Sequence, residues 1–276
     1  MPNQKKSLNT LDLLAISTEL TELRDSIIDK VYTMSNSLLF RFRKESEKYF
    51  VIANSHRFGL TSYVLEHGAE GVSSLRRLIE GMRLRSIELL NFDRIVKLSF
   101  SDGYLVIELL KPWNAIYVSN DNIIRWVLRT YRGKDRVISI GLEYKPPPQG
   151  FVKPVDDHES MVKALQGYDT VGKAIARGLG LGGEIANEVC TRASIDCALP
   201  VNTINLDSVI SVIRTMINTI SRGELEPTIY YSNGVPITVT PIKYLSIKYD
   251  DIKQFRRFNE AVDEYFHEVE VREESE

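Results

Sequence analysis

The sequence predicts an α+β fold, in which a β-sandwich or barrel lobe with flanking helices precedes a helical lobe. Three observations lead to this prediction. Short apolar segments with strand-like alternation recur up to about residue 140. A proline-rich stretch, KPPPQGFVKP, occupies residues 145–154. Beyond it, the apolar residues recur at helical spacing.

The first helix is expected to begin near Thr10, with Asn9 or Thr10 as its cap. Asp12 lies in the first turn, where the helix dipole favours a carboxylate, so spacing alone favours a structural role for this residue. The apolar residues that recur at largely helical spacing from here are Leu11, Leu14, Ile16, Leu20, Leu23, Ile27 and Val31.

Short strands are expected next, in SLLFRFRK, KYFVIAN and GLTSYVL, and a short helix follows around SSLRRLIEGM. An antiparallel meander comes after this helix. DRIVKLSF turns at Asp102-Gly103, a strong hairpin signal, into YLVIELL, and NAIYVS turns at Asn120-Asp121 into IIRWVLR. The prediction is therefore seven or eight strands by about residue 140.

The prolines of residues 145–154 favour an extended linker. Four helices are expected after it, in ESMVKALQG, TVGKAIARGLG, GEIANEVCTRA and DSVISVIRTMINTIS. Short strands around Asn233-Gly234 and an acidic helix, FRRFNEAVDEYFHEVEVREESE, follow. We therefore divide the chain into residues 1–145, 155–223 and 224–276.

The composition is that of a globular protein, with 43% hydrophobic and 26% charged residues among 276. No apolar run approaches the ~20 residues of a membrane helix. The polar start, MPNQKKSLNT, lacks the apolar segment of a signal peptide. Cys190 and Cys197 show no metal-ligand pattern and suggest no disulfide framework, which favours a reducing, cytosolic setting. No catalytic set, cofactor or metal site is expected.

The formal net charge of −2 hides an asymmetry along the chain. Residues 250–276 have a balance of −6, so the rest of the chain sums to +4, and residues 71–140 alone have a balance of +5. A mildly basic body of this kind permits a polyanion partner, although ordinary solvated charge explains it equally well.

The stretch GLGLGG, residues 178–183, matches G-x-G-x-x-G, but a helix rather than a strand precedes it, which excludes a dinucleotide site. The expectation is a tight connection between two helices, with glycines at positive φ. Gly180, Gly182 and Gly183 would expose backbone N–H groups at the start of the next helix, an arrangement that binds phosphate. Geometry alone favours a plain hinge.

Asp93 and Arg94 stand at the entrance of the predicted strand in NFDRIVKLSF, residues 91–100. Successive side chains of a strand point to opposite faces, so these two residues do not pair with each other unless a bulge intervenes. Each needs another partner, in the protein or in something it binds. A structural ion pair between Arg94 and Asp12 is one open alternative.

The segment GLGGEIANEVCTRASI resembles the helix–two-turn–helix motif of the formamidopyrimidine-DNA glycosylases. The match falls on Gly180, Gly182, Gly183, Ala186, Asn187, Glu188, Arg192, Ala193 and Ile195. Gly183 stands where that family has an Asn that contacts phosphate. Pro2 matches the family's nucleophilic proline, but Asn3 replaces the catalytic Glu that follows it there. Glycosylase activity is therefore an alternative only.

A second resemblance runs over the whole chain. TLDLLAISTEL, SLRRLIEGMRL, FDRIVKLSF, LVIELLKPWNAIYVS and RVISIGLEYKPPP, in this order, resemble the N-terminal domain of the NFACT family. These are ribosome-quality-control proteins, often named fibronectin-binding proteins in bacteria, and their N-terminal domain is described as glycosylase-like plus helix–two-turn–helix. FRRFNEAVDEYF resembles the point where the family enters its long coiled coil.

The resemblance implies functional residues. In the family, the Asp of the first helix and an Asp-Arg pair are tied to tRNA handling and tail synthesis, and they correspond to Asp12, Asp93 and Arg94. Arginine suits phosphate because its planar fork donates two hydrogen bonds. Further candidates for the same surface are Arg76, Arg77 and Arg136.

The resemblance also implies a cytoplasmic RNA-binding adaptor rather than an enzyme. Such a protein engages large ribosomal subunits with stalled peptidyl-tRNA and recruits tRNA for untemplated C-terminal tailing of the nascent chain. The ribosome would supply the chemistry, and a coiled coil and a second RNA-binding domain would follow residue 276. The alternatives are a glycosylase-type nucleic-acid enzyme and a fibronectin-binding surface protein. The missing signal peptide opposes the second.

Overall fold

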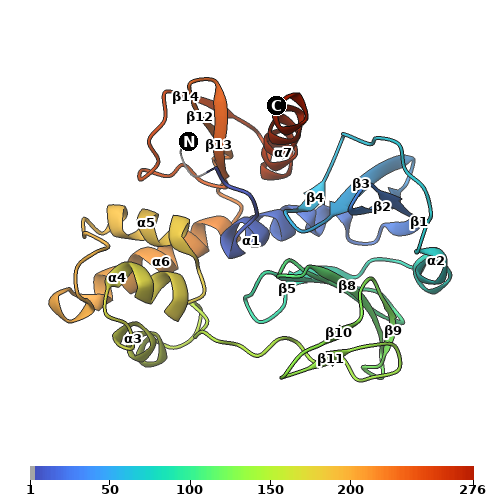
Figure 1. Ribbon diagram of the computed structural model, residues 1–276, viewed down its shortest axis with the longest axis horizontal. Coiled ribbons are helices and arrows are strands. Elements are labelled where there is room, and N and C mark those ends of the chain that lie inside the picture. Colours follow the sequence, from blue (N-terminus) through green and yellow to red (C-terminus); the bar gives the residue numbers. More distant parts are fainter. Residues whose placement is uncertain (1–3) are drawn as a thin grey trace.

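The structure is a computed structural model that describes residues 4–276. Its parts are arranged around one central helix, α1 (Thr10–Glu19) (Figure 1). This helix contacts four elements that belong to different parts of the chain: β4 (Phe58–Leu60), β5 (Ser86–Leu89), α6 (Leu206–Ser221) and α7 (Phe258–Ser275). The α+β class predicted from the sequence is confirmed.

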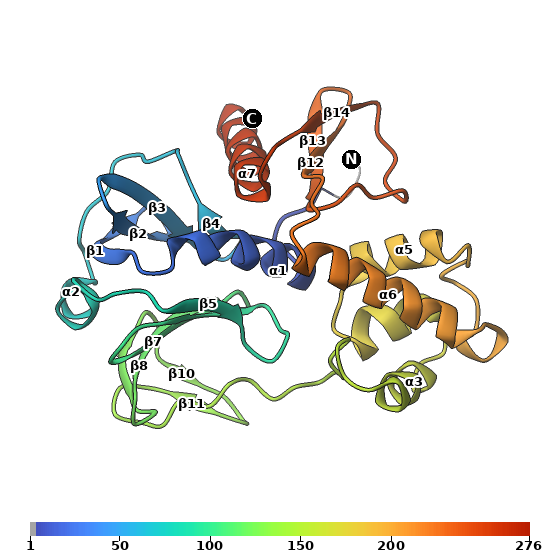
Figure 2. The ribbon, with the colours of Figure 1, turned by 180° about the vertical axis from the view of Figure 1, so that it is seen from behind.

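Two antiparallel sheets lie on either side of α1, as the front and back views show (Figures 1 and 2). The first sheet contains, in spatial order, β1 (Ile27–Met34), β2 (Ser37–Lys44), β3 (Glu47–Ala53) and β4. After α2 (Ser73–Ile79), the second sheet contains β5, β6 (Ile95–Ser99), β7 (Gly103–Glu108), β8 (Asn114–Ser119) and β9 (Ile124–Val127). A small hairpin, β10 (Tyr131–Arg132) and β11 (Val137–Ile138), follows.

Strand β6 shows why the second sheet is stable. Val96 and Leu98 face the main core, which also contains buried residues of α1 and of the first sheet. Ile95, on the opposite face, joins a second buried cluster with Val106 and Ile116. The sheet is therefore buried on both faces, and the predicted alternation of β6 is confirmed.

The helical pattern at the start of the chain extends further than the helix does. Helix α1 ends at Glu19, a 3-10 turn covers Leu20–Leu23, and Ile27 and Val31 belong to strand β1. The prediction that these two residues continue the helical stripe was wrong. Asp25 has a φ of 71°, which ends the helical path, and the β-branched residues after it pair with β2.

Residues 145–154 contain no helix or strand, in agreement with their prolines, and run from the second sheet to the helical group. Each of the four predicted helices is present: α3 (His158–Gln166), α4 (Val171–Lys173) with a π-helical turn (Ala174–Gly178), α5 (Gly183–Arg192), and α6 after the short 3-10 turn Val201–Thr203. Within the described residues, no helix combines the length and the apolarity that crossing a bilayer requires.

Cys190 and Cys197 form a disulfide, with an S–S distance of 2.14 Å. The sequence suggested no disulfide, and that expectation was wrong. The chain turns back after α5 at Ser194, whose φ is 55°, and the Ile195 N–H donates to the Cys190 carbonyl, which brings the two Cα atoms within 5.7 Å. The argument for a reducing setting from unpaired cysteines therefore no longer applies.

The last part of the chain is a three-stranded sheet with a helix docked beside it. Strands β12 (Thr228–Ser232) and β13 (Val235–Thr240) turn at Asn233-Gly234, both at positive φ, as predicted, and β14 (Asp251–Gln254) pairs with β12. Helix α7 then buries one face, including Phe258, Val262 and Phe266.

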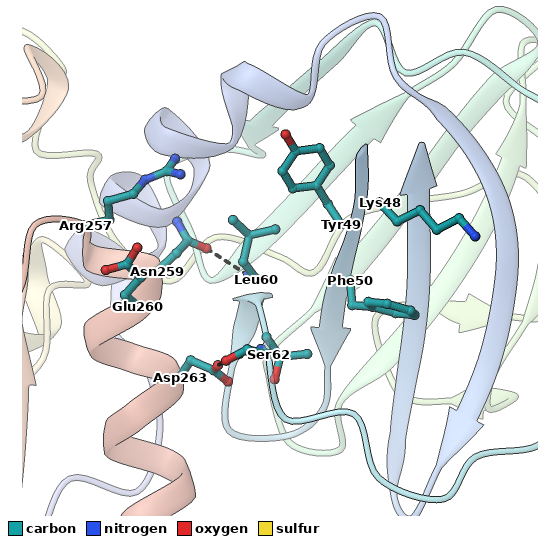
Figure 3. A pocket seen from close by; sticks show the side chains of 10 residues that line it. Lys48, Tyr49, Phe50, Leu60, Ser62, Arg257, Asn259, Glu260 and Asp263 are labelled. Atoms are coloured by element: carbon teal, nitrogen blue, oxygen red, sulfur yellow. Dashed lines mark hydrogen bonds between the residues drawn. The ribbon is translucent and has the colours of Figure 1, made fainter. Parts of the chain in front are cut away.

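Buried polar side chains hold α7 in place. The Glu19 carboxylate accepts hydrogen bonds from the backbone N–H groups of Phe258 and Asn259, so α1 caps α7. The Asn259 side chain accepts the Leu60 N–H at 2.8 Å (Figure 3), and Asp263 accepts the Ser62 N–H. These bonds satisfy donors that β4 and the segment after it would otherwise leave unpaired.

We expect a protease of broad specificity to cut residues 145–154, or the end of α7, before the sheets. Residues 145–150 are largely exposed and their backbone lacks the protection of helix or strand. Cleavage sites are mapped by mass spectrometry at short digestion times. Early cleavage within residues 93–110 would contradict this domain boundary.

We expect Asp263→Ala to lower the free energy of unfolding by about 3–5 kcal/mol. Arg57 NH1 lies 2.7 Å from Asp263 Oδ1 and its side chain is 4% exposed, so the substitution leaves a buried charge without its partner. Glu270→Ala, at an exposed position of the same helix, is the control and should change stability by less than about 0.5 kcal/mol. Equal urea midpoints for the two variants would contradict the role of Asp263.

Candidate functional site

Asp93 and Arg94 lie in the turn of the β5–β6 hairpin, directly before β6. At the tip of this hairpin, Asn91 and Phe92 have φ values of 56° and 51°. The Asp93 carboxylate accepts the Arg94 N–H at 2.7 Å, and the Arg94 carbonyl accepts the Leu109 N–H at 2.9 Å. The backbone of the pair is therefore held from both sides.

The side chain of Arg94 is half-buried and free to bind. Among residues 4–276, no side-chain hydrogen bond or ion pair involves its guanidinium, and the Asp93 carboxylate accepts only the backbone donor. Among the described residues the two side chains do not pair with each other, as expected, although both lie in the turn before β6 and not in the strand itself. The guanidinium keeps its hydrogen-bond donors available to a ligand.

Asp12 is placed quite differently. It is fully buried at the start of α1, where it forms a capping box with Asn9. Its Oδ2 lies 2.7 Å from Nζ of Lys5, and Lys5 also contacts Glu184 at 2.6 Å. The alternative that Arg94 neutralises Asp12 was wrong, because Lys5 does so.

Burial governs the electrostatics of this cluster. It raises the pKa of Asp12 to about 6, while Lys5 lowers that pKa and Glu184 raises it. For Lys5, burial lowers the pKa, but Asp12 and Glu184 outweigh burial and the net shift is upward. Asp12 Oδ1 and the Tyr244 hydroxyl are buried without a hydrogen-bond partner among the described residues.

The three other arginines singled out by the sequence have unequal surroundings. Arg76 donates to the Val31 carbonyl and lies over the Tyr32 ring. Arg77 is exposed. Arg136 donates two hydrogen bonds of 2.7 Å to the buried carboxylate of Glu108, so it has a structural partner.

The glycine loop connects two helical segments, as predicted. Gly180 and Gly182 have φ values of 66° and 82°, and a Cβ at Gly180 would lie 2.6 Å from the Phe151 ring. Gly183 is the first residue of α5, and nothing lies within 4 Å of a Cβ there. This helix start is open, but Glu184 places a carboxylate in its first turn, which disfavours phosphate.

The sequence did not reveal which residues pair with Asp12 and Arg136. Lys5 belongs to a polar stretch with no recognisable pattern. Glu108 had a signal, because it is a carboxylate inside the apolar run YLVIELL and a buried strand tolerates a charge only with a partner. That partner comes from 28 residues further along the chain.

Among the described residues, no group of three or more His, Cys, Asp or Glu could hold a metal ion. Pro2, on which the glycosylase alternative rests, lies outside these residues. A pocket of about 380 Å³ lies between β3, β4 and the start of α7 (Figure 3). Its buried polar groups, Asn259 and Asp263, dock α7, so we do not assign a ligand to it.

Comparisons with known proteins agree with one family. The family described as NFACT N-terminal and middle domains matches residues 9–276. The archaeal Rqc2 homolog aRqcH of Methanocaldococcus jannaschii is 27% identical over 95% of this chain and 42% of its own length. The ribosome quality control complex subunit 2 of Schizosaccharomyces pombe is 28% identical over 51% of this chain and 15% of its own length. The chain therefore spans less than half of these relatives.

Among solved structures, the fibrinogen binding protein from Staphylococcus aureus has the same fold. It superposes with a TM-score of 0.77 at 17% identity and covers 94% of this chain and 98% of its own. At this identity the likeness establishes fold alone.

We expect Asp12→Asn to change how stability depends on pH. The folded protein raises the pKa of Asp12 from the usual 3.8 to about 6, so the native state binds more protons than the unfolded state between these values. The contribution of Asp12 therefore falls as pH rises from 4 to 6 and is constant above. Relative to the variant, the unfolding free energy of the wild type should fall by on the order of 2–3 kcal/mol. The measurement is urea unfolding of both proteins from pH 4 to 7. An equal change in unfolding free energy with pH for the wild type and the variant would contradict this prediction.

Proposed function

The chain belongs to the NFACT family, and we propose that it is an RNA-binding adaptor of ribosome quality control. In this proposal it engages large ribosomal subunits that carry stalled peptidyl-tRNA. It also recruits tRNA for untemplated C-terminal tailing of the nascent chain. The ribosome forms the peptide bonds, and this chain contributes binding and positioning.

One observation carries the proposal, namely the free guanidinium of Arg94 on a fixed backbone. The carboxylate of Asp93 and the N–H of Leu109 hold the main chain on both sides of it. A planar fork that is unpaired and carried on a fixed backbone suits an RNA phosphate, because it can donate two parallel hydrogen bonds. Asp12 supports this site indirectly, because it caps α1, and α1 contacts β5 of the same sheet.

The relatives' names support the ribosomal setting. The archaeal match is named an Rqc2 homolog, and the fission-yeast match is named a subunit of the ribosome quality control complex. Since the chain spans less than half of either protein, their partners come to it as part of this proposal.

A second candidate is binding of an extracellular protein, which the name of the S. aureus structure suggests for that protein. It predicts a surface location and saturable binding of fibrinogen or fibronectin. Cell fractionation together with surface plasmon resonance distinguishes it from the ribosomal proposal. Co-sedimentation with large ribosomal subunits, and no binding to either extracellular protein, supports the adaptor.

We expect Arg94→Ala to abolish tail addition while leaving the melting temperature near that of the wild type. Among residues 4–276 the half-buried Arg94 has no ion pair to lose, and even an exposed ion pair contributes only ~0–1 kcal/mol to stability. Two properties are measured. The first is the melting temperature, and the second is the amount of C-terminal tail added to stalled nascent chains in cells that express the full-length protein or its variant.

Arg136→Ala is the matched control for this experiment. It leaves the buried carboxylate of Glu108 without its charge partner and should cost ~3–5 kcal/mol of stability. A large drop in melting temperature for Arg94→Ala would indicate a structural role instead. A near-native melting temperature with intact tails would show that the Asp93–Arg94 pair is not part of the function.

A further inference from the structure

One end of the five-stranded sheet continues into a hairpin, of which only Arg136 was singled out from the sequence. Strand β6 begins, β7 ends, β8 begins and β9 ends at this sheet end, as their register shows. Beyond β9, residues 129–136 fold into β10 and its turn and come back through β11. We call residues 129–136 the basic arm.

Two buried polar side chains of the sheet end anchor this arm. The Asn114 amide donates to the Arg129 carbonyl at 2.8 Å, and its oxygen accepts the Arg129 N–H at 3.0 Å. Glu108, only 1% exposed, binds Arg136 through two bonds and also accepts the Tyr144 hydroxyl at 2.8 Å. The start and the end of the arm are therefore fixed to the sheet.

Cations without partners gather on and beside the arm. Among residues 4–276, none of these exposed side chains belongs to an ion pair: Lys111, Arg129, Arg132, Lys134 and Lys145. Asp135 is the single carboxylate of the arm itself. The Arg129 guanidinium lies over the Trp113 ring, 5.9 Å from its centroid, which restricts its motion. A concentration of unpaired cations is unfavourable by itself and suits a polyanion.

The arm also offers an aromatic surface. Tyr131 is 38% exposed, and the Arg136 guanidinium lies over one face of its ring, with Cζ 5.6 Å from the ring centroid. It borders a hollow of about 170 Å³ whose other walls include Lys111, Pro112, Arg129, Pro147 and Pro148. An exposed ring between cations is the arrangement on which an unpaired base stacks while its phosphates meet Arg and Lys.

We propose that the basic arm binds the looped or single-stranded part of an RNA, with Arg132 and Lys134 on phosphates and Tyr131 under a base. The proposal rests on the proposed function and extends it. Arg94 and the arm belong to the same sheet end, because Ile95 pairs with Glu108 and Glu108 pairs with Asn114. One RNA could therefore contact both. An acidic protein segment would use the same cations but would not need the ring.

The test uses this chain with three probes: a tRNA, a hairpin RNA and a blunt duplex RNA. We expect the double variant Arg132→Ala, Lys134→Ala to weaken tRNA binding about tenfold or more per lost contact. Each lost contact to single-stranded phosphate lowers the log–log salt slope by ~0.7. Tyr131→Ala should weaken tRNA and hairpin binding roughly fivefold to 100-fold and leave duplex binding unchanged.

Arg125→Ala is the control. Arg125 is an exposed arginine of β9, but it is paired with Asp121 at 2.8 Å, so its loss should leave affinity and salt slope as they are. Melting temperatures of all variants are measured in parallel, and Lys134→Ala alone, on the turn of the arm, replaces the double variant if that variant does not fold.

The outcomes separate the two proposals. If the wild type binds tRNA and the arm variants bind equally well, the arm is not an RNA site and the role of Arg94 is unaffected. If Tyr131→Ala has no effect and an acidic peptide competes with the wild type for tRNA, the arm is a protein-binding surface. If the wild type binds none of the three RNAs, the arm is not an RNA site, and co-sedimentation with large ribosomal subunits then tests the adaptor function separately.

Discussion

Two carboxylates at opposite ends of α1 connect the separate parts of this fold. Asp12 binds Lys5, and Lys5 binds Glu184 at the start of α5. Glu19 accepts the first backbone donors of α7. Between these ends, buried residues such as Leu13 and Ile16 fill the space between the two sheets. Asp12 is fully buried and is stable only with its partner, and the half-buried Glu19 caps the start of α7, so the positions of the helical group and of α7 both depend on this one helix.

Among residues 4–276, some arginines pair with a buried carboxylate and others contact no carboxylate at all. Arg57, Arg136 and Arg192 each contact a buried carboxylate, on Asp263, Glu108 and Glu188 respectively, and they hold elements together. Within the part of the chain that the structure describes, Arg94, Arg129 and Arg132 contact no carboxylate, and they lie at one end of the second sheet or on the hairpin beyond it. An arginine that pairs with a buried carboxylate thus donates its hydrogen bonds within the protein and is not available to a ligand. We therefore expect the arginines that bind a ligand to be among those that lack such a carboxylate partner.

Local sequence signals predicted most of the helices, strands and turns, because interactions between residues close in sequence determine these elements. Asn233-Gly234 forms the expected turn since both residues tolerate positive φ, and the four helices after the linker follow their apolar spacing. Strand β1 was missed because Ile27 and Val31 also fit a helical stripe, and only pairing with β2 decides between the two. The disulfide was missed because the turn at Ser194 is not visible in the spacing of the cysteines.

The candidate site could be predicted only in part, for a related reason. Arg94 and Asp93 were found through resemblance, and they do not pair with each other, as expected, although they lie in the turn before β6 and not in the strand. Which carboxylate neutralises which cation is a long-range property. Asp12 pairs with Lys5, and Glu108 pairs with an arginine 28 residues away. The arginines without a carboxylate partner could therefore be identified only in the three-dimensional structure. A carboxylate in an apolar run, such as Glu108, is nevertheless a usable signal, because it predicts that a cation elsewhere in the chain is buried against it. That cation is then not expected to bind a ligand.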